Sequence, residues 1–265
     1  MKLAACVDGV GILGPGLVDW STAARILGGG ADYAPAPIDL PAPSLLPVAE
    51  RRRTGRIVKL ALAVALEATR GADADAASLG SVFASSGGDG ANCHEICATL
   101  AEPQREISPT RFTNSVHNAA SGYWGIAAGS MRPSQALGAY DASFAAGLLE
   151  ALVSVTLESE PILLVAYDGP YPEPLHAIRP ITAEFAIGLV LSPRQGPRSI
   201  AHIEATIGRG EAEALGEPRL ETLRRAAPAA RSLPLLAALA ARRPRLATLE
   251  YLDGTALRVE VSPCA

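Results

Sequence analysis

FTNSVHNAASGYWGIAAGSMRPSQALGAYDASFAAGLL, residues 112–149, carries the most informative secondary-structure signals of the chain. It predicts a polar loop, a helix of small residues, a proline-containing turn, an apolar strand and a second small-residue helix. The strand, QALGAYDA, is predicted to be buried, because it is a mostly apolar run bounded by turn residues. A strand that passes directly into a Gly- and Ala-rich helix presents one residue at a sharp tip. Here the tip is Ala142, Ser143 and Phe144.

Strands and helices alternate on both sides of this stretch. GSVFASSGGDG predicts a strand and a glycine turn, whereas PILLVAYDGP and EFAIGLVLSP are typical of strands covered on both faces. This alternation predicts an α/β layered fold with a largely parallel sheet. Towards the C-terminus, SIAHIEATIGRG predicts a strand, residues 219–243 predict helical pieces broken by Pro228 and Pro234, and LATLEYLDGTALRVEVS predicts a hairpin turning at Asp253 and Gly254.

The order of these elements resembles the N-terminal half of a β-ketoacyl synthase. CVDGVGILGPG, ERRRTGRIVKLALAVALEA and EFAIGLVLSP occur in that family's order, and SVHNAASGYW is similar to the chain-length-factor-like proteins of aryl polyene biosynthesis. The resemblance covers residues 1–192. It implies a truncated thiolase-like α/β fold for that part of the chain, with residues 193–265 forming a C-terminal cap of helices and a β-hairpin.

Two departures from the family pattern bear on function. An active ketosynthase carries a cysteine three residues before a helical glycine, but counting back from Gly147 gives Phe144, with Ser143 beside it. The family's C-terminal half supplies two histidines, and no matching motif occurs here. Without a thiolate and these histidines, condensation by the known route is not expected. The resemblance therefore implies a subunit with no catalytic residue and no cofactor, paired with a catalytic ketosynthase that elongates polyene chains on an acyl carrier protein.

In this family the strand before the tip pairs across a twofold axis with the partner's strand. The resemblance thus places the partner interface on Gln135, Ala136, Leu137, Gly138, Ala139, Tyr140 and Asp141. The chain's own chemistry agrees, since an apolar strand at a sheet edge promotes aggregation unless a partner covers it.

The loop FTNSVHNAAS has two interpretations. Asn118 or Ser121 can cap the following helix, and His117 can satisfy buried backbone groups. Alternatively, Asn114, His117 and Asn118, together with Phe144, line the acyl channel near the partner.

Two further functions remain open. One is an acyltransferase with Ser143 as nucleophile, for which His117 is the nearest candidate base. The other is a self-associating acyl-binding protein without a ketosynthase partner.

Residues 50–70 predict a helix with one apolar face and a basic start. The cations are Arg51, Arg52, Arg53, Arg56 and Lys59. They form either a solvated face or a docking surface for a partner's acidic surface or an acyl carrier protein.

The composition of the chain limits which classes of protein and partner are expected. The 265 residues are 49% hydrophobic with a net charge of −4, which suits one large core and argues against a nucleic-acid partner. Four cysteines lack disulfide-framework spacing, and MKLAACVDGV lacks the apolar core of a signal peptide. No apolar run is long enough for a membrane span. We expect a cytoplasmic protein.

Two other motifs are weak. Gly9, Gly11 and Gly14 have dinucleotide-site spacing, but the prolines that follow fit a glycine-rich strand end better. Cys93, His94 and Cys97 do not all share a helix face, so a metal site is not expected and the cysteines are predicted to lie in the core. The aromatic pair Tyr123 and Trp124 is also predicted to be core.

Overall fold

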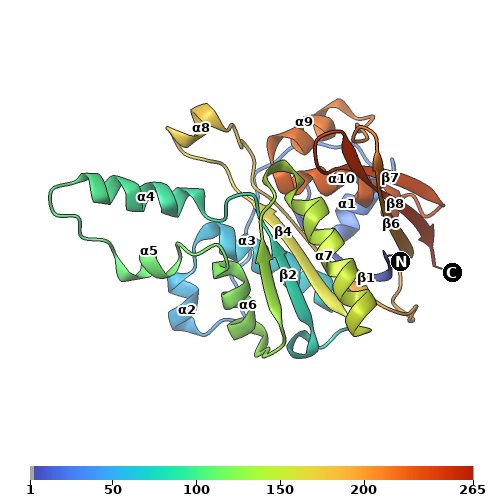
Figure 1. The fold of residues 1–265 in the computed structure, drawn as a ribbon, viewed down its shortest axis with the longest axis horizontal. Coiled ribbons are helices and arrows are strands. Elements are labelled where there is room, and N and C mark those ends of the chain that lie inside the picture. Colours follow the sequence, from blue (N-terminus) through green and yellow to red (C-terminus); the bar gives the residue numbers. More distant parts are fainter. Residues whose placement is uncertain (1–2, 265) are drawn as a thin grey trace.

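The apolar runs of the sequence form the strands of one continuous sheet. The computed structural model describes residues 3–264, and in it eight strands lie in the order β3-β2-β4-β5-β1-β6-β8-β7 (Figure 1). The strands are β1 (Leu3–Leu13), β2 (Gly80–Ala84), β3 (Ser134–Leu137), β4 (Ile162–Asp168), β5 (Phe185–Ser192), β6 (Ala201–Arg209), β7 (Arg245–Glu250) and β8 (Thr255–Pro263). β2, β4 and β5 are buried along their whole length, as their uninterrupted apolar sequences predict.

The prediction of a largely parallel sheet is wrong. Only β3, β2 and β4 run parallel, and each further pair, from β4 with β5 to β7 with β8, is antiparallel. The connection from β4 to β5 explains the first reversal, because residues 169–184 contain only the short helix α8 (Leu175–Ile178) rather than a crossover helix. The fold is therefore a mixed α/β sheet.

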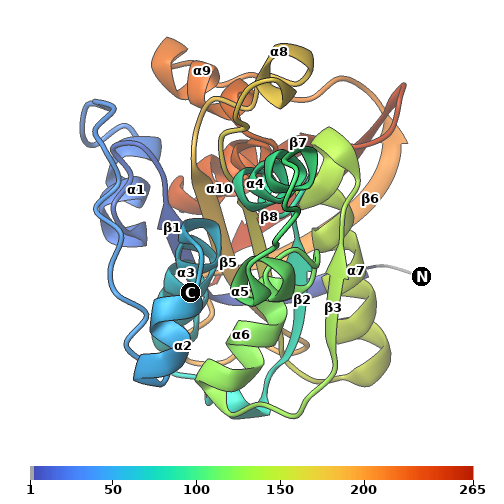
Figure 2. The same ribbon diagram turned by 90° about the vertical axis from the view of Figure 1, so that its left-hand side faces the viewer.

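Helices cover both faces of the sheet. α3 (Arg56–Gly71) and α6 (Ala119–Ala128) pack on one face, whereas α7 (Ser143–Glu158) packs on the other with the C-terminal helices (Figure 2). Besides α8, the remaining helices are α1 (Trp20–Leu27), α2 (Val48–Arg53), η1 (Ala76–Ser78), α4 (Gly90–Ala101), α5 (Pro109–Thr113), η2 (Tyr140–Ala142), α9 (Pro218–Ala226), η3 (Pro228–Ser232) and α10 (Leu233–Ala240).

Residues Tyr140–Glu158, which include α7, are long and apolar enough to cross a membrane by length and composition alone. Over half of this stretch, 56%, is buried inside the protein, as in a core helix of a soluble fold.

The glycines of β1 allow α3 to approach the sheet closely. A side-chain carbon at Gly9 would lie 2.0 Å from the carbonyl oxygen of Ala68, and one at Gly11 would lie 2.1 Å from that of Val64. Any larger residue would therefore push the helix off the strand. Gly9 and Gly11 therefore serve close packing between β1 and α3. This agrees with the interpretation of the segment as a glycine-rich strand end.

The predicted helix over residues 50–70 is two helices. α2 ends at Arg53, Thr54 adopts an extended conformation, and α3 starts at Arg56. The Thr54 hydroxyl donates to the carbonyl oxygens of Glu50 and Arg51, so it caps the end of α2. Gly55 is also extended and is the N-cap residue of α3.

α4 and α5 project from the body of the protein (Figure 1). Cys93 and Cys97 lie on α4 and are exposed, so their predicted core location is wrong. The reason is that α4 buries only Gly90 and Asn92 and has no apolar face against the sheet. Tyr123 and Trp124, in contrast, are buried core residues as predicted. Within residues 3–264, no cluster of three His, Cys, Asp or Glu side chains could hold a metal ion.

The C-terminal part contains the predicted helices and hairpin. β6 pairs with β1 and β8 pairs with β6, so the hairpin extends the sheet. η3 and α10 pack over the same face as α7, in the cluster that includes Leu233, Leu236 and Phe144. The division at residue 192 stays a prediction.

Candidate functional site

The tip between β3 and α7 is a tight turn held by one serine. β3 ends at Leu137, and Tyr140 adopts a left-handed conformation with φ of 55° before η2 leads into α7. The Ser143 hydroxyl accepts from the Ala139 N–H at 3.0 Å and donates to the Tyr140 carbonyl at 2.7 Å. Both hydrogen-bonding roles of this hydroxyl are thus used by the turn itself.

Phe144 follows at the first turn of α7. Its side chain is 1% exposed and lies in the core with Leu148, Leu164 and Ile187. A phenyl ring has no nucleophilic or acid–base group, so it fills space at the position that the resemblance assigns to the reactive cysteine. The geometry there supports packing and no covalent chemistry.

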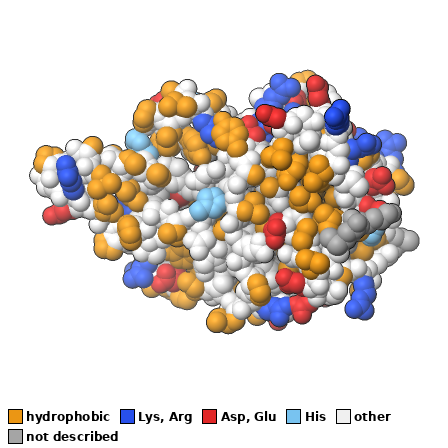
Figure 3. Space-filling view, in the orientation of Figure 1, with side chains coloured by type: hydrophobic (Ala, Val, Ile, Leu, Met, Phe, Trp, Pro, Cys, Tyr) orange, Lys and Arg blue, Asp and Glu red, His pale blue; other side chains and the backbone are white. Residues whose placement is uncertain are grey.

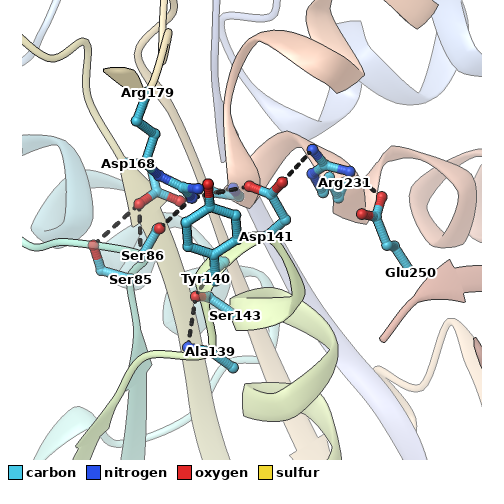
Figure 4. Close-up of polar contacts among 11 residues, drawn as sticks. Ser85, Ser86, Ala139, Tyr140, Asp141, Ser143, Asp168, Arg179, Arg231 and Glu250 are labelled. Carbon is cyan, nitrogen blue, oxygen red and sulfur yellow. Dashed lines mark hydrogen bonds and ion pairs between the residues drawn. The ribbon is translucent and has the colours of Figure 1, made fainter. Parts of the chain in front are cut away.

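Asp141, within the tip, is clamped between two arginines (Figure 4). Arg179 Nη2 lies 2.9 Å from Asp141 Oδ1, and Arg231 Nη2 lies 3.0 Å from Asp141 Oδ2. Arg231 also pairs with Glu250 on β7, and Arg179 stacks 3.4 Å from the centre of the Tyr140 ring. The arginines come from the α8 segment and η3, so distant parts of the chain fix the tip. Half-buried ion pairs of this kind hold a geometry more firmly than exposed ones.

A second polar centre lies at the end of β4. The Asp168 carboxylate, 2% exposed, accepts from the N–H groups of Ser86 and Ala229, both at 2.8 Å, and from the Ser85 hydroxyl at 3.2 Å. Burial raises the pKa of Asp168 to about 7, against the opposing effect of these hydrogen bonds. Asp168 therefore joins the end of β2, the end of β4 and η3 beneath the tip.

The polar loop residues do not converge on one cavity. Asn114 is buried and its amide donates to the Arg53 carbonyl at 2.7 Å, which ties the loop to α2. His117 is exposed and its Nε2 lies 3.0 Å from the Ser85 carbonyl. Asn118 is the N-cap residue of α6 without a side-chain cap bond, and Ser121 donates to its carbonyl. The His117 contact with a backbone carbonyl agrees with the structural interpretation of the loop, but the prediction that Asn118 or Ser121 caps the helix with its side chain is wrong. An acyl-channel role stays a prediction.

The basic residues predicted for carrier docking (Arg51, Arg52, Arg53, Arg56 and Lys59) lie on α2 and the start of α3. Arg53 pairs with Glu50, and Arg56 makes a two-point contact with Glu184 at 2.6 and 2.8 Å. Arg52 is exposed and has no ion pair within the described part of the chain. The cluster is thus less free to dock a partner than its sequence indicated.

The predicted interface strand is shorter and more exposed than expected. β3 spans only Ser134–Leu137 at the edge of the sheet, and Gln135, Ala136, Gly138 and Tyr140 are exposed, whereas Leu137, Ala139 and Asp141 are half-buried. The prediction that this run is buried is therefore wrong for this chain. Gly138 and the η2 turn end the strand early, and β3 has β2 on only one side.

Beside β3, α7 presents apolar side chains outward. Ala146, Leu149 and Val153 are half-buried and Leu157 is 68% exposed, at a spacing that places them on one helix face. Figure 3 shows hydrophobic side chains gathered over α7 in this view. The edge strand and this stripe together form what we call the β3–α7 face.

Sequence reasoning missed Arg179, Arg231 and Asp168. The arginines lie in segments with no pattern that points to residue 141, which is 38 residues from Arg179. Asp168 did leave a signal, because it is the single acidic residue ending the apolar run of β4.

Comparison with known proteins identifies the family. The family model for the β-ketoacyl synthase N-terminal domain matches residues 20–249. This chain belongs to that family. A search of curated proteins gave no match.

Solved ketosynthase complexes share the fold of this family member. A ketosynthase in complex with its chain length factor from Xenorhabdus doucetiae matches with a TM-score of 0.73 at 22% identity, over 97% of this chain and 99% of that one. The ishigamide ketosynthase/chain length factor gives 0.74 at 15% identity over 99% and 100%. A type II ketosynthase in complex with its acyl-carrier protein gives 0.79 at 13% identity, with both chains covered completely. The fold is therefore that of the thiolase-like ketosynthase N-terminal domain.

Proposed function

We propose that this chain is a non-catalytic, chain-length-factor-like subunit that pairs with a catalytic β-ketoacyl synthase in the cytoplasm. The partner holds the reactive cysteine and histidines and elongates a polyene on an acyl carrier protein. This chain completes the dimer interface and walls off the end of the partner's acyl tunnel. The observation that carries the proposal is the buried phenyl ring of Phe144 where an active ketosynthase needs a thiolate.

The acyltransferase alternative has weaker support. A serine nucleophile needs an adjacent base, but Ser143 bonds to the backbone of Ala139 and Tyr140, and His117 contacts the Ser85 carbonyl. Within residues 3–264 no hydrogen bond joins Ser143 to His117 or to another base. The side chain is also 1% exposed, so an acyl group could not reach it without opening the turn.

The β3–α7 face supports a partner. It combines an unpaired strand edge with an apolar helix stripe, and both are unfavourable in water unless covered. The neighbouring structures are complexes of ketosynthases with a chain length factor or a carrier protein. A ketosynthase partner fits this face because its own edge strand would continue the sheet.

The deciding experiment is co-expression of this chain with the ketosynthase encoded nearest to it, followed by purification through a tag on this chain alone. We expect a stoichiometric complex whose condensing activity is lost when the partner's cysteine is replaced. A solitary chain that loads acyl groups by itself would support the acyltransferase. A stable homodimer that excludes the ketosynthase would support the self-associating acyl-binding protein.

Replacing Ser143 by alanine should leave the activity of the complex unchanged and lower the stability of the chain. The substitution leaves the Ala139 N–H without its acceptor, which costs about 1–2 kcal/mol of unfolding free energy. Ser154→Ala is the control, because Ser154 is buried on the same helix and makes no such contact with the turn. Denaturant melts and product assays of both variants check this. Abolished turnover in a stably folded Ser143→Ala complex would favour a nucleophile.

A further inference from the structure

A large cavity lies on the opposite side of the sheet from the β3–α7 face. Its volume is about 710 Å³, and α3 forms its longest wall. Cavities of this size hold small organic ligands in other proteins. Figure 2 shows α3 and α7 on opposite sides of the sheet, so the cavity is separate from the tip at Ser143.

One face of α3 lines the cavity. The side chains of this helix that line the cavity are Lys59, Leu62, Ala63, Leu66, Glu67 and Arg70, and the last residue of the helix, Gly71, lines it too. Their spacing of three, one, three, one and three places all six on a single stripe. At 1.5 Å per residue, the stripe is about 16 Å long. The middle of the stripe is apolar, and a cation lies at each end. This pattern suits a ligand that has an apolar chain and a charged head group.

The facing walls are also apolar. Val18 and Leu45 line the cavity and are 54% and 42% exposed, although each is a large aliphatic side chain. Both tryptophans of the chain, Trp20 and Trp124, line it as well. Exposed aliphatic groups on two walls that face one cavity are costly in water, and an apolar ligand would remove that cost.

The charges at the cavity favour an anionic head group. Two of its three acids are committed to the backbone: Glu67 accepts from the N–H groups of Ile12 and Trp20 at 2.9 and 2.6 Å, and Asp19 caps α1 by accepting from Thr22. Burial raises the pKa of Glu67, against the opposing effect of these two hydrogen bonds.

The cationic side chains of the cavity lie at the two ends of the stripe. Lys59 and Arg70 have no ion pair within the described part of the chain, and of the three carboxylates that line the cavity Asp19 and Glu67 are held by backbone N–H groups while Asp39 is exposed. We propose that this cavity binds a medium-chain aliphatic carboxylate, with the chain along α3 and the carboxylate at Lys59 or Arg70.

The two tryptophans make the proposal directly measurable. N-phenyl-1-naphthylamine, a neutral apolar fluorophore, should bind the full chain and receive energy transfer from Trp20 and Trp124. Dodecanoate should displace it, and dodecanol should displace it at least tenfold less well. Absence of energy transfer, or equal displacement by the alcohol and the acid, would overturn the assignment. If the chain is obtained only in complex with its partner, calorimetric titration of the complex with dodecanoate measures the binding instead.

Variants locate the site. Leu66→Asp should weaken dodecanoate binding at least tenfold, and Leu252→Asp, the same change at an exposed leucine of the C-terminal hairpin, should not. Ala63→Phe fills the groove without adding a charge and covers the case in which Leu66→Asp does not fold. Lys59→Gln and Arg70→Gln identify the end that holds the carboxylate. Binding that survives Ala63→Phe and both glutamine variants would refute a site along α3.

Discussion

A complex of this chain with its ketosynthase partner is expected to lose at least a hundredfold in affinity when Ala136 is replaced by proline. The hydrogen bonds of β3 explain the choice of residue. The N–H groups of Ser81 on β2 and of Ser85 just after it donate to the carbonyls of Pro133 and Leu137 at 3.0 and 3.1 Å. Backbone groups alternate in direction along a strand, so Ala136 turns its own N–H and carbonyl to the open edge.

Proline at position 136 therefore removes a donor that β2 does not use. Edge strands tolerate proline when its missing N–H faces outward, so the chain itself should lose less than about 1 kcal/mol of stability. The partner strand, in contrast, loses a main-chain hydrogen bond and meets the pyrrolidine ring. A hundredfold weakening is about 2.8 kcal/mol, which these two losses together can supply.

Two control variants separate this effect from misfolding. Ala136→Val keeps the N–H and favours the strand, so it should preserve the complex. Gln135→Pro removes a donor on the side that faces β2 and should destabilise the chain itself. Calorimetric titration of the partner measures the affinities, and chemical denaturation measures the stability. If Ala136→Pro binds the partner as tightly as the wild type, strand pairing is not the mode of association.

The sequence was sufficient for the layers of the fold because the strand signals are local. β2, β4 and β5 have uninterrupted apolar runs, and the hairpin of β7 and β8 has Asp253 and Gly254 at its turn. The direction of a strand, in contrast, cannot be read from the strand's own residues. It depends on what the connection between β4 and β5 folds into, and residues 169–184 carry no strong helix pattern.

Only part of the candidate site could be predicted, because the rest depends on contacts between segments that are far apart in the sequence. The sequence itself shows that residue 144 is not a cysteine, once the family resemblance has aligned this position with the reactive cysteine. The contacts that fix the tip are not, since Arg231 lies 90 residues beyond Asp141 and only the packing of η3 beside α7 brings them together. Burial of the interface strand was also misjudged, because an edge and a central strand with the same short apolar run look alike in sequence.

Asp168 should make the stability of the chain fall as pH rises from about 4 to about 7. Burial raises the pKa of this carboxyl in the folded state from 3.8 to about 7. Between these values the unfolded chain has released the proton and the folded chain has kept it, so the unfolded state gains on the folded one as pH increases. Below about 4 both states are protonated and above about 7 both are ionised, so the contribution is then constant. Each unit of pKa difference is worth about 1.4 kcal/mol, which predicts a decline of a few kcal/mol across this range.

Asp168→Asn isolates this effect, since an amide does not titrate. Other carboxyls also contribute to the pH dependence, including Glu67, whose pKa burial raises, and Glu221, whose pKa Arg224 lowers. The difference in unfolding free energy between wild type and Asp168→Asn cancels their contributions and should shift by a few kcal/mol between pH 4 and pH 8. Asp253→Asn, the same change at the exposed hairpin turn, is the control variant. Parallel curves for wild type and Asp168→Asn would mean that the three hydrogen bonds from Ser85, Ser86 and Ala229 offset the cost of burial and hold the carboxylate ionised.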